Sequence, residues 1–180
     1  CQEGQVYCLA SNATLAPAVY RFDIDTHAAT LLFGEPEVMP LAHISQAQMV
    51  RFPSADARES YMWFYPPVHG DVLGPASERP PLIVMSHGGP TGYANNAFNL
   101  QIQFWTSRGF AVADVNYAGS TGFGRAYRDS LKGNWGVYDV QDCVHAARYL
   151  TEQGLVDGER LCIRGGSAGG YTTLCALAFY

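Results

Sequence analysis

The sequence predicts an α/β protein with a mainly parallel sheet, preceded by a short segment that contains strands only. Two observations support this prediction. Three largely apolar runs, at residues 82–85, 110–115 and 161–163, alternate with helix-like stretches, which is typical of parallel strands buried on both faces. Residues 4–34 instead show short runs separated by polar turns and no helical spacing, which favours antiparallel strands.

The composition narrows the class of protein. With 180 residues, of which 48% are hydrophobic, the chain is long enough to bury a sizeable core. Only 15% of the residues are charged and the formal net charge is -5, so we expect no basic surface for nucleic acid or anionic lipid. No apolar run approaches the length of a membrane span. The sequence therefore predicts neither nucleic acid nor a membrane as a partner.

The five cysteines form an odd set without the spacing of a metal site. We interpret them as buried free thiols in a reducing compartment, which predicts a cytoplasmic protein. We expect no metal and no cofactor. The cysteines are Cys1, Cys8, Cys143, Cys162 and Cys175.

The N-terminal segment reads as three strands, because apolar residues alternate or cluster over short lengths between polar turns. A sheet of this size cannot bury both of its faces alone. Residues 35–46 contain Pro36 and Pro40 among polar residues and predict a linker. The expected strands are residues 5–10, 18–24 and 30–33.

The rest of the chain begins with a predicted hairpin at the edge of a sheet, formed by residues 47–52 and 59–65, and a proline-rich loop at residues 66–81. Polar, glycine-rich stretches follow each of the three buried runs. Since parallel strands end at the same edge of a sheet, these stretches should meet there. The expected helices are residues 99–108, ended by Gly109, residues 137–150, ended by Gly154, and residues 172–179.

The stretch after the third apolar run contains Gly-x-Ser-x-Gly, with Ser167 at its centre. A serine on a sharp turn from strand to helix has its Oγ exposed, so we predict Ser167 as a nucleophile. The small neighbours Gly166 and Ala168 suit a turn over which strand and helix close. The alternative is a glycine-rich connection between strand and helix that has no catalytic role. A phosphate-binding loop is not indicated, because its glycine patterns do not occur here.

The stretch after the first apolar run supplies a candidate oxyanion hole. The amide of Ala168 is the expected first donor, and Gly89 is the expected second donor, with Gly88 as the alternative. His87 lies before Ser167 in the chain, so we interpret it as a brace for this loop rather than as the general base. All five histidines precede Ser167, and none is a convincing base.

Three aromatic residues near these stretches are candidates for a substrate pocket, namely Tyr117, Phe123 and Tyr171. Simple packing of Tyr117 and Phe123 in their loop is the alternative interpretation. Trp135 reads as a packing anchor before the second long helix. Arg125 and Arg128 are expected to form a loop-stabilising ion pair with Asp114, Asp129 or Asp139, and a substrate carboxylate is the alternative partner.

Four of these motifs occur in the order that is found in one family of hydrolases. The chain resembles the prolyl oligopeptidase family, in particular the branch of acylaminoacyl peptidases and dipeptidyl-peptidase-like enzymes. The resemblance runs from residue 47 to the end, while residues 1–34 resemble the last blade of a β-propeller. The motifs are His87-Gly88-Gly89-Pro90, the loop at residues 114–125, Trp135-Gly136, and residues 165–171.

The resemblance implies an α/β-hydrolase fold that stops after the helix of the nucleophile turn, with residues 35–46 as the linker and residues 47–180 as the first part of the catalytic domain. It implies a serine peptidase that hydrolyses short peptides through an acyl-enzyme on Ser167. The triad Asp and His would follow residue 180, so these 180 residues alone would be inactive. Its partners would be the propeller and the remaining hydrolase segments of the same protein, and a homo-oligomer is possible in this branch.

Two departures from the family pattern concern the site. Some relatives carry a tyrosine at the position of His87, so this chain would rely on backbone amides for the oxyanion. Many relatives carry arginine at the position of Ala118, which removes a substrate-anchoring side chain. Two alternatives remain open at this stage, a carboxylesterase on the same fold and a non-catalytic module used in assembly.

Overall fold

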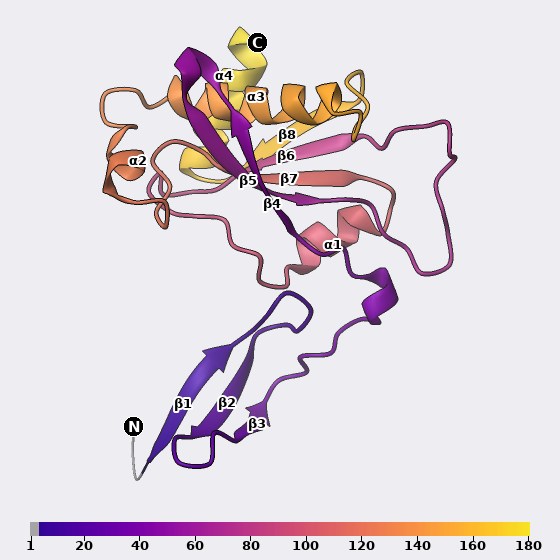
Figure 1. The fold of residues 1–180 in the computed structure, drawn as a ribbon, viewed down its shortest axis with the longest axis vertical. Helices are drawn as coiled ribbons and strands as arrows, with labels where there is room; N and C mark the ends of the chain where they lie inside the picture. Colours follow the sequence, from indigo (N-terminus) through magenta and orange to yellow (C-terminus); the bar gives the residue numbers. More distant parts are fainter. Residues whose placement is uncertain (1–3) are drawn as a thin grey trace.

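The computed structural model describes residues 4–180 and contains two separate β-sheets (Figure 1). A three-stranded sheet has the order β1-β2-β3, and a five-stranded sheet has the order β4-β5-β7-β6-β8. The first three residues of the predicted propeller segment, including Cys1, lie outside the described range. The strands are β1 (Gln5–Ala10), β2 (Ala18–Asp23), β3 (Ala29–Phe33), β4 (Gln48–Pro53), β5 (Glu59–Tyr65), β6 (Leu82–Ser86), β7 (Ala111–Asn116) and β8 (Leu161–Gly165).

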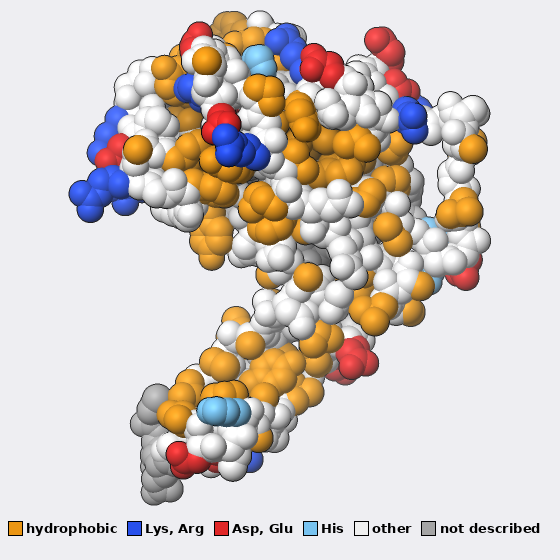
Figure 2. Space-filling model, viewed as in Figure 1, with side chains coloured by type: hydrophobic (Ala, Val, Ile, Leu, Met, Phe, Trp, Pro, Cys, Tyr) orange, Lys and Arg blue, Asp and Glu red, His pale blue; other side chains and the backbone are white. Residues whose placement is uncertain are grey.

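The three-stranded sheet confirms the antiparallel strands expected at the N-terminus, since β1 pairs with β2 and β2 with β3 in that sense. Its hydrophobic side chains lie largely on the surface, as Figure 2 shows. Every residue of β3 is exposed, and Phe33 exposes 77% of its surface. The sheet does not form a closed core of its own within the described residues. Two backbone hydrogen bonds join this segment to the rest of the chain, from the Ala16 amide to the Pro36 carbonyl at 2.9 Å and from the Phe98 amide to the Asn12 carbonyl at 2.7 Å.

The five-stranded sheet combines a parallel part with an antiparallel hairpin. Strand β6 is parallel to both β7 and β8, as predicted from the alternation of apolar runs and helices. The hairpin β4–β5 joins at one side, because β5 is antiparallel to β7. The expected position of this hairpin at the edge of the sheet is confirmed.

Helices cover both faces of the five-stranded sheet (Figure 1). Helices α3 and α4 pack on one face and α1 lies on the other. The five-residue α2 was not predicted, because so short a helix shows no apolar periodicity. Among residues 4–180, no helix has the length and apolar character needed to span a membrane. The helices are α1 (Leu100–Thr106), α2 (Arg125–Asp129), α3 (Tyr138–Glu152) and α4 (Ala168–Phe179), with 3-10 turns η1 (Leu41–His43) and η2 (Ala55–Ala57).

The core is divided by the sheet, because successive side chains of a strand point to opposite faces. Leu82 and Val84 of β6 join the larger cluster, which also contains Cys143 and Leu150 of α3. Ile83 joins the smaller cluster with Ile102 of α1. The middle strands are therefore buried on both faces, as their continuous apolar sequences predict.

The expectation that residues 161–163 form a third fully buried strand is wrong. Strand β8 is an edge strand of the described sheet, and four of its five residues are exposed. Its apolar sequence is the same in kind as that of β6, but it has a pairing partner on one side only. For the same reason Cys162 is exposed, as is Cys8, so the predicted burial of the thiols holds only for Cys143 and Cys175.

Candidate active site

The Gly-x-Ser-x-Gly segment forms the turn from strand to helix that the sequence predicts. Ser167 stands between the end of β8 and the start of α4, and it is exposed. Its backbone has φ 55° and ψ -123°, a conformation that costs an L-residue about 1–3 kcal/mol. Such strain persists only where the surrounding packing imposes it. The turn is therefore held in place by its neighbours rather than by its own preference.

The glycines that permit the turn are Gly165 and Gly169. A Cβ on Gly169 would lie 2.1 Å from the carbonyl oxygen of Ser86, and a Cβ on Gly165 would lie 2.4 Å from the Gly169 carbonyl oxygen. By contrast, a Cβ on Gly166 would meet no atom within 4 Å. The expectation that Gly166 must be small because strand and helix close over it is therefore wrong. The close approach occurs one residue before it and at Gly169, where α4 crosses the end of β6.

The end of β6 lies directly against this turn. The Ser86 hydroxyl donates a hydrogen bond to the Gly169 carbonyl at 2.9 Å. A Cβ on Gly88 would lie 3.4 Å from Ser167 Cβ and 4.0 Å from Ser167 Oγ. At Gly89, φ is +134°, and a Cβ would collide with the amides of Thr91 and Gly92. The two glycines predicted as oxyanion-hole candidates thus belong to a loop whose backbone passes the side of Ser167.

His87 is held on three sides. Its ring stacks on Tyr117 with the centroids 4.2 Å apart, its Nδ1 lies 2.8 Å from the Gly88 carbonyl, and its Nε2 lies 2.7 Å from Ser120 Oγ. Burial lowers the pKa of His87, which favours the neutral ring, while the hydrogen bond to the Gly88 carbonyl acts in the opposite direction. The Ser120 hydroxyl has one proton, which it can give either to Nε2 of His87 or to the Tyr117 carbonyl, 2.7 Å away.

This geometry supports the bracing interpretation of His87, since both of its ring nitrogens are engaged by the protein. Within residues 4–180, no histidine forms a hydrogen bond with Ser167, and Ser167 Oγ has no hydrogen-bond partner. His27 stacks on Phe22 in the three-stranded sheet, and His43 packs against His69. The described residues thus bring together the candidate nucleophile and its backbone loop, but they do not supply a base.

The three aromatic candidates for a substrate pocket lie in different places. Tyr117 is completely buried in the larger core cluster, where its hydroxyl donates to the His87 carbonyl at 2.7 Å. It therefore packs and braces, and the interpretation that it lines a pocket is wrong. Phe123 stacks on Tyr61 at 4.4 Å, in line with the packing alternative. Tyr171 is exposed and packs against Trp135 at 5.1 Å.

Two other predictions for this region have different outcomes. Arg128 forms an ion pair with Asp129 at 3.2 Å, one of the three partners expected. Trp135, however, exposes 51% of its surface and is not an anchor in the core of the described residues. Its neighbour Gly136 explains why the chain bends there, because φ is +84° and the Gly136 amide donates to Asp139 at 2.6 Å.

A pocket of about 460 Å³ opens beside this loop, on the α1 side of the sheet. One carboxylate faces it, that of Asp114 on β7, and burial raises the pKa of Asp114 to about 7. Arg164 of β8 lines the same pocket. Besides these two, the lining includes Met85, Ser86, His87, Tyr93, Ala94, Asn95, Ala97, Phe98, Asn99, Gln101, Gly165 and Gly166.

One group of potential metal ligands occurs among the described residues, on the linker and the loop that precedes β6. Atoms of His43, His69 and Asp71 lie within 4.8 Å of one another. Each histidine, however, turns its Nδ1 to a backbone amide, that of Gly70 at 3.1 Å and that of Asp71 at 3.2 Å. A neutral ring in that orientation carries its proton on Nε2, so this group is a hydrogen-bonded cluster.

Sequence reasoning missed the residues that hold the site together. Ser120 and Ser86 are buried, and they bind the His87 ring and the first turn of α4, respectively. Asp139 and Asp142 are two buried acids on α3, and Asp139 also accepts from the Thr172 hydroxyl at 2.5 Å. The signal that could have revealed them is the presence of two carboxylates on the apolar face of an otherwise regular helix.

Ser167 lies on a turn from strand to helix at the edge of a mixed sheet, with a glycine loop at its side. This is the arrangement of the nucleophile in α/β-hydrolases. Comparison with known sequences gives the family. Residues 96–180 match the sequence profile of the prolyl oligopeptidase family. The chain is 30% identical over 180 residues to dipeptidyl aminopeptidase BIII of Pseudoxanthomonas mexicana, an alignment that covers 98% of this chain and 26% of that protein. The chain belongs to the prolyl oligopeptidase family.

Solved structures agree with this assignment. A puromycin-hydrolyzing peptidase of Mycobacterium tuberculosis superposes with a TM-score of 0.94 at 40% identity, over 98% of this chain and 27% of that one. The acylaminoacyl peptidase of Pyrococcus horikoshii superposes with a TM-score of 0.79 at 26% identity, over 100% of this chain and 28% of that one. The chain thus spans about a quarter of the length of these relatives.

Proposed function

We propose that the protein is a serine peptidase that hydrolyses short peptides through an acyl-enzyme on Ser167. The observation that carries this proposal is the exposed, strained Ser167 between β8 and α4, with the backbone of the β6 loop packed against it. Strain of this kind is stored at functional sites, where it presents a side chain in a fixed direction. The names of the relatives, among them a dipeptidyl aminopeptidase and a puromycin-hydrolyzing peptidase, support the choice of a peptide substrate.

In the proposed reaction Ser167 Oγ attacks the carbonyl carbon of the scissile peptide bond, and a histidine takes the hydroxyl proton. The negative charge that develops on the carbonyl oxygen is stabilised by two backbone amides, those of Ala168 and Gly89, with Gly88 as the alternative to Gly89. The C–N bond then breaks, and the histidine gives its proton to the leaving amine. Water, activated by the same histidine, cleaves the ester and releases Ser167.

We further propose that the histidine and the aspartate that orients it come from other segments of the same protein. Both nitrogens of His87 are already engaged, and within residues 4–180 no other histidine bonds to Ser167. The relatives are about four times as long as this chain, so they have room for such segments. In this view residues 47–180 form the first part of an α/β-hydrolase domain, residues 35–46 form a linker, and residues 1–34 form the last blade of a propeller.

The test compares a peptide anilide with a nitrophenyl ester as substrates of the complete protein, for the wild type and for Ser167→Ala. The proposal predicts turnover of the anilide that Ser167→Ala reduces by about a thousandfold or more. Some ester cleavage is expected as well, since an activated ester is the easier substrate. Ester cleavage without anilide cleavage would instead indicate a carboxylesterase. A wild type that cleaves neither substrate would indicate a non-catalytic module.

A further inference from the structure

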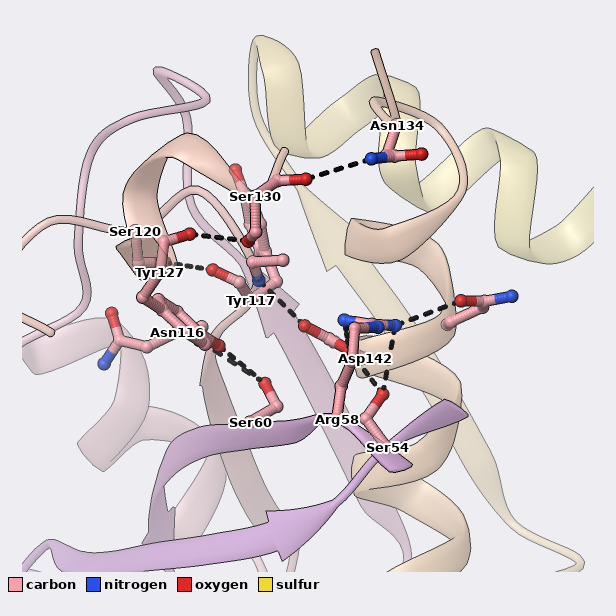
Figure 3. A network of polar contacts seen from close by, with 12 residues as sticks. Ser54, Arg58, Ser60, Asn116, Tyr117, Ser120, Tyr127, Ser130, Asn134 and Asp142 are labelled. Atoms are coloured by element: carbon pink, nitrogen blue, oxygen red, sulfur yellow. Dashed lines mark hydrogen bonds and ion pairs between the residues drawn. The ribbon is translucent and has the colours of Figure 1, made fainter. Parts of the chain in front are cut away.

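Helix α3 carries a carboxylate that links two loops of the site to the hairpin at the sheet edge. Asp142 is completely buried, and all of its contacts come from hydrogen-bond donors (Figure 3). Its Oδ1 accepts from the Ser54 hydroxyl and from Arg58 Nη1, the latter at 2.9 Å. Its Oδ2 accepts from the backbone amide of Ala118 at 2.8 Å. A group that only accepts suits an ionised carboxylate.

The two carboxylate oxygens serve different elements. The Oδ1 side binds the turn between β4 and β5, where Arg58 also lies over the Tyr138 ring and donates to Gln141. The Oδ2 side binds a single group, the Ala118 amide, in the loop that follows β7. Burial raises the pKa of Asp142, while Ser54, Ala118 and Arg58 lower it. The hydrogen bond between Asp142 Oδ2 and the Ala118 amide thus connects α3 to the loop beside the candidate site.

The loop that Asp142 anchors holds His87 from two directions. Tyr117, the residue before Ala118, donates to the His87 carbonyl and stacks on its ring. Ser120, two residues after Ala118, meets Nε2 of the same ring at 2.7 Å. His87 in turn binds the Gly88 carbonyl, and the backbone of Gly88 passes Ser167. A continuous series of contacts therefore runs from Asp142 to the side of the candidate nucleophile.

We propose that Asp142 is a positioning residue for the peptidase reaction, which fixes the His87-Gly88-Gly89 loop against Ser167 through the Ala118 amide. The proposal rests on the proposed role of Ser167. Its physical reason is that an amide donor must lie within hydrogen-bond distance of the oxyanion, and a displacement of about 1 Å can reduce the rate about a hundredfold. Asp142 touches no reacting atom, so its effect has to be transmitted through the loop.

The test uses the complete protein and three variants. Asp142→Asn has a single acceptor oxygen, so it cannot serve Arg58 and the Ala118 amide from two oxygens at once. Ser120→Ala removes the contact with the His87 ring and leaves α3 unchanged. Ser54→Ala is the matched control, because it removes a hydrogen bond to Asp142 on the Oδ1 side and leaves Ala118 in place.

Two measurements are made on each variant. The first is kcat and KM for a peptide anilide. The second is the rate at which diethyl pyrocarbonate modifies His87, followed by peptide mass spectrometry, with His145 on α3 as the internal reference. The second measurement needs no activity, and it reports whether the His87 ring nitrogens are still engaged.

We expect Asp142→Asn and Ser120→Ala to lower kcat about tenfold to a hundredfold with KM changed less than about threefold. His87 should react faster with the reagent in both, while Ser54→Ala behaves as the wild type. Wild-type kcat and wild-type His87 reactivity in Asp142→Asn would overturn the proposal, as would equal effects of Asp142→Asn and Ser54→Ala. If Asp142→Asn does not fold, wild-type kcat and wild-type His87 reactivity in Ser120→Ala would still overturn the proposal, because the series of contacts would then not hold the loop. If the wild type is inactive, the proposed function fails, and His87 reactivity alone still tests the contact series.

Discussion

The two sides of the candidate site are built differently. On the β6–β7 side, residues 86–89 and 116–120 are held by the core, and Tyr117 and Ser120 are completely buried. On the β8–α4 side, residues 161–180, apolar side chains face outward, with Leu177 and Phe179 exposing 69% and 77% of their surfaces. The backbone loop beside Ser167 is thus complete within the described residues. The apolar surface around Ser167 is left uncovered by the described residues, and we propose that further segments of the same protein cover it.

The two sides meet where Gly169 of α4 packs against Ser86 of β6, and this contact can be tested by substitution. Gly169→Ala forces a methyl group against the Ser86 carbonyl, a rigid backbone atom, so we expect a loss of about 3 kcal/mol or more in the free energy of unfolding. Gly166→Ala is the matched control, because its Cβ meets open space, and we expect no loss or a gain of up to about 1 kcal/mol. Urea unfolding of both variants measures the difference. Equal stabilities would contradict the close packing at Gly169.

The buried β7 side also carries a charge, which predicts a pH dependence. Burial raises the pKa of Asp114 from 3.8 to about 7 in the folded chain, so the folded state binds a proton that the unfolded state releases between these values. This contribution to stability is complete below pH 4 and is lost as the pH rises through about 7. Asp114→Asn should therefore gain stability relative to the wild type between pH 5 and 8.

The measurement for Asp114 is the difference in unfolding free energy between the wild type and Asp114→Asn, followed across this pH range. Half-buried acids such as Asp157 and Asp129, whose hydrogen bonds lower their pKa values, act in the opposite direction but cancel in the difference. A difference that stays constant from pH 5 to 8 would show that Asp114 is not desolvated in the pocket.

The approach of the β6 loop to Ser167 can be tested without disturbing the fold. A methyl group at Gly88 would stand at ordinary contact distance from Ser167 Cβ and from the Gly166 carbonyl. We expect Gly88→Ala to fold and to react with substrate about tenfold or more slowly, because the methyl group occupies the space beside Oγ. Gly74→Ala, in open space on a distant part of the sequence, is the control for the substitution itself. Full activity of Gly88→Ala would contradict the close approach of the β6 loop to Ser167.

The smallest expected effect concerns the hydroxyl of Tyr117. Tyr117→Phe removes its hydrogen bond to the His87 carbonyl and leaves that group short of a partner, which should cost about 1 kcal/mol of stability. Tyr93→Phe serves as the control, since Tyr93 is exposed and its hydroxyl makes no hydrogen bond within residues 4–180. Thermal unfolding of the two variants gives the comparison. A larger loss in Tyr93→Phe would contradict the bracing role of Tyr117.

The sequence predicts local structure well wherever local patterns decide it. The apolar runs locate β6 and β7, the hairpin at residues 48–65 appears at the sheet edge, and the Gly-x-Ser-x-Gly segment is a turn from strand to helix. The exposure of β8 was missed, because burial depends on neighbouring strands and not on a strand's own residues. The sequence pattern therefore predicted correctly that β8 is a strand, but wrongly that it is buried.

The sequence predicted the candidate nucleophile and the glycine loop, but not the buried polar residues that hold them in place. Ser167 and the glycine loop carry recognisable motifs, whereas the contacts of Ser120 and Asp142 join residues that lie far apart in the chain. Such contacts leave no trace in spacing. Tyr117 illustrates the same limit, since an aromatic residue in a glycine-rich loop can face either a pocket or the core, and only the fold shows that it faces the core.

A fluorophosphonate probe reacts only with an activated serine, so labelling followed by intact mass and peptide mapping shows whether Ser167 is the nucleophile. The complete protein should gain one adduct, located on Ser167, and Ser167→Ala should gain none. The 180-residue chain of 19.6 kDa should gain none either, because it lacks the proposed histidine and aspartate. An adduct on that chain would contradict the proposed source of the base. A complete protein that stays unlabelled, or is labelled at another residue, would contradict the role of Ser167.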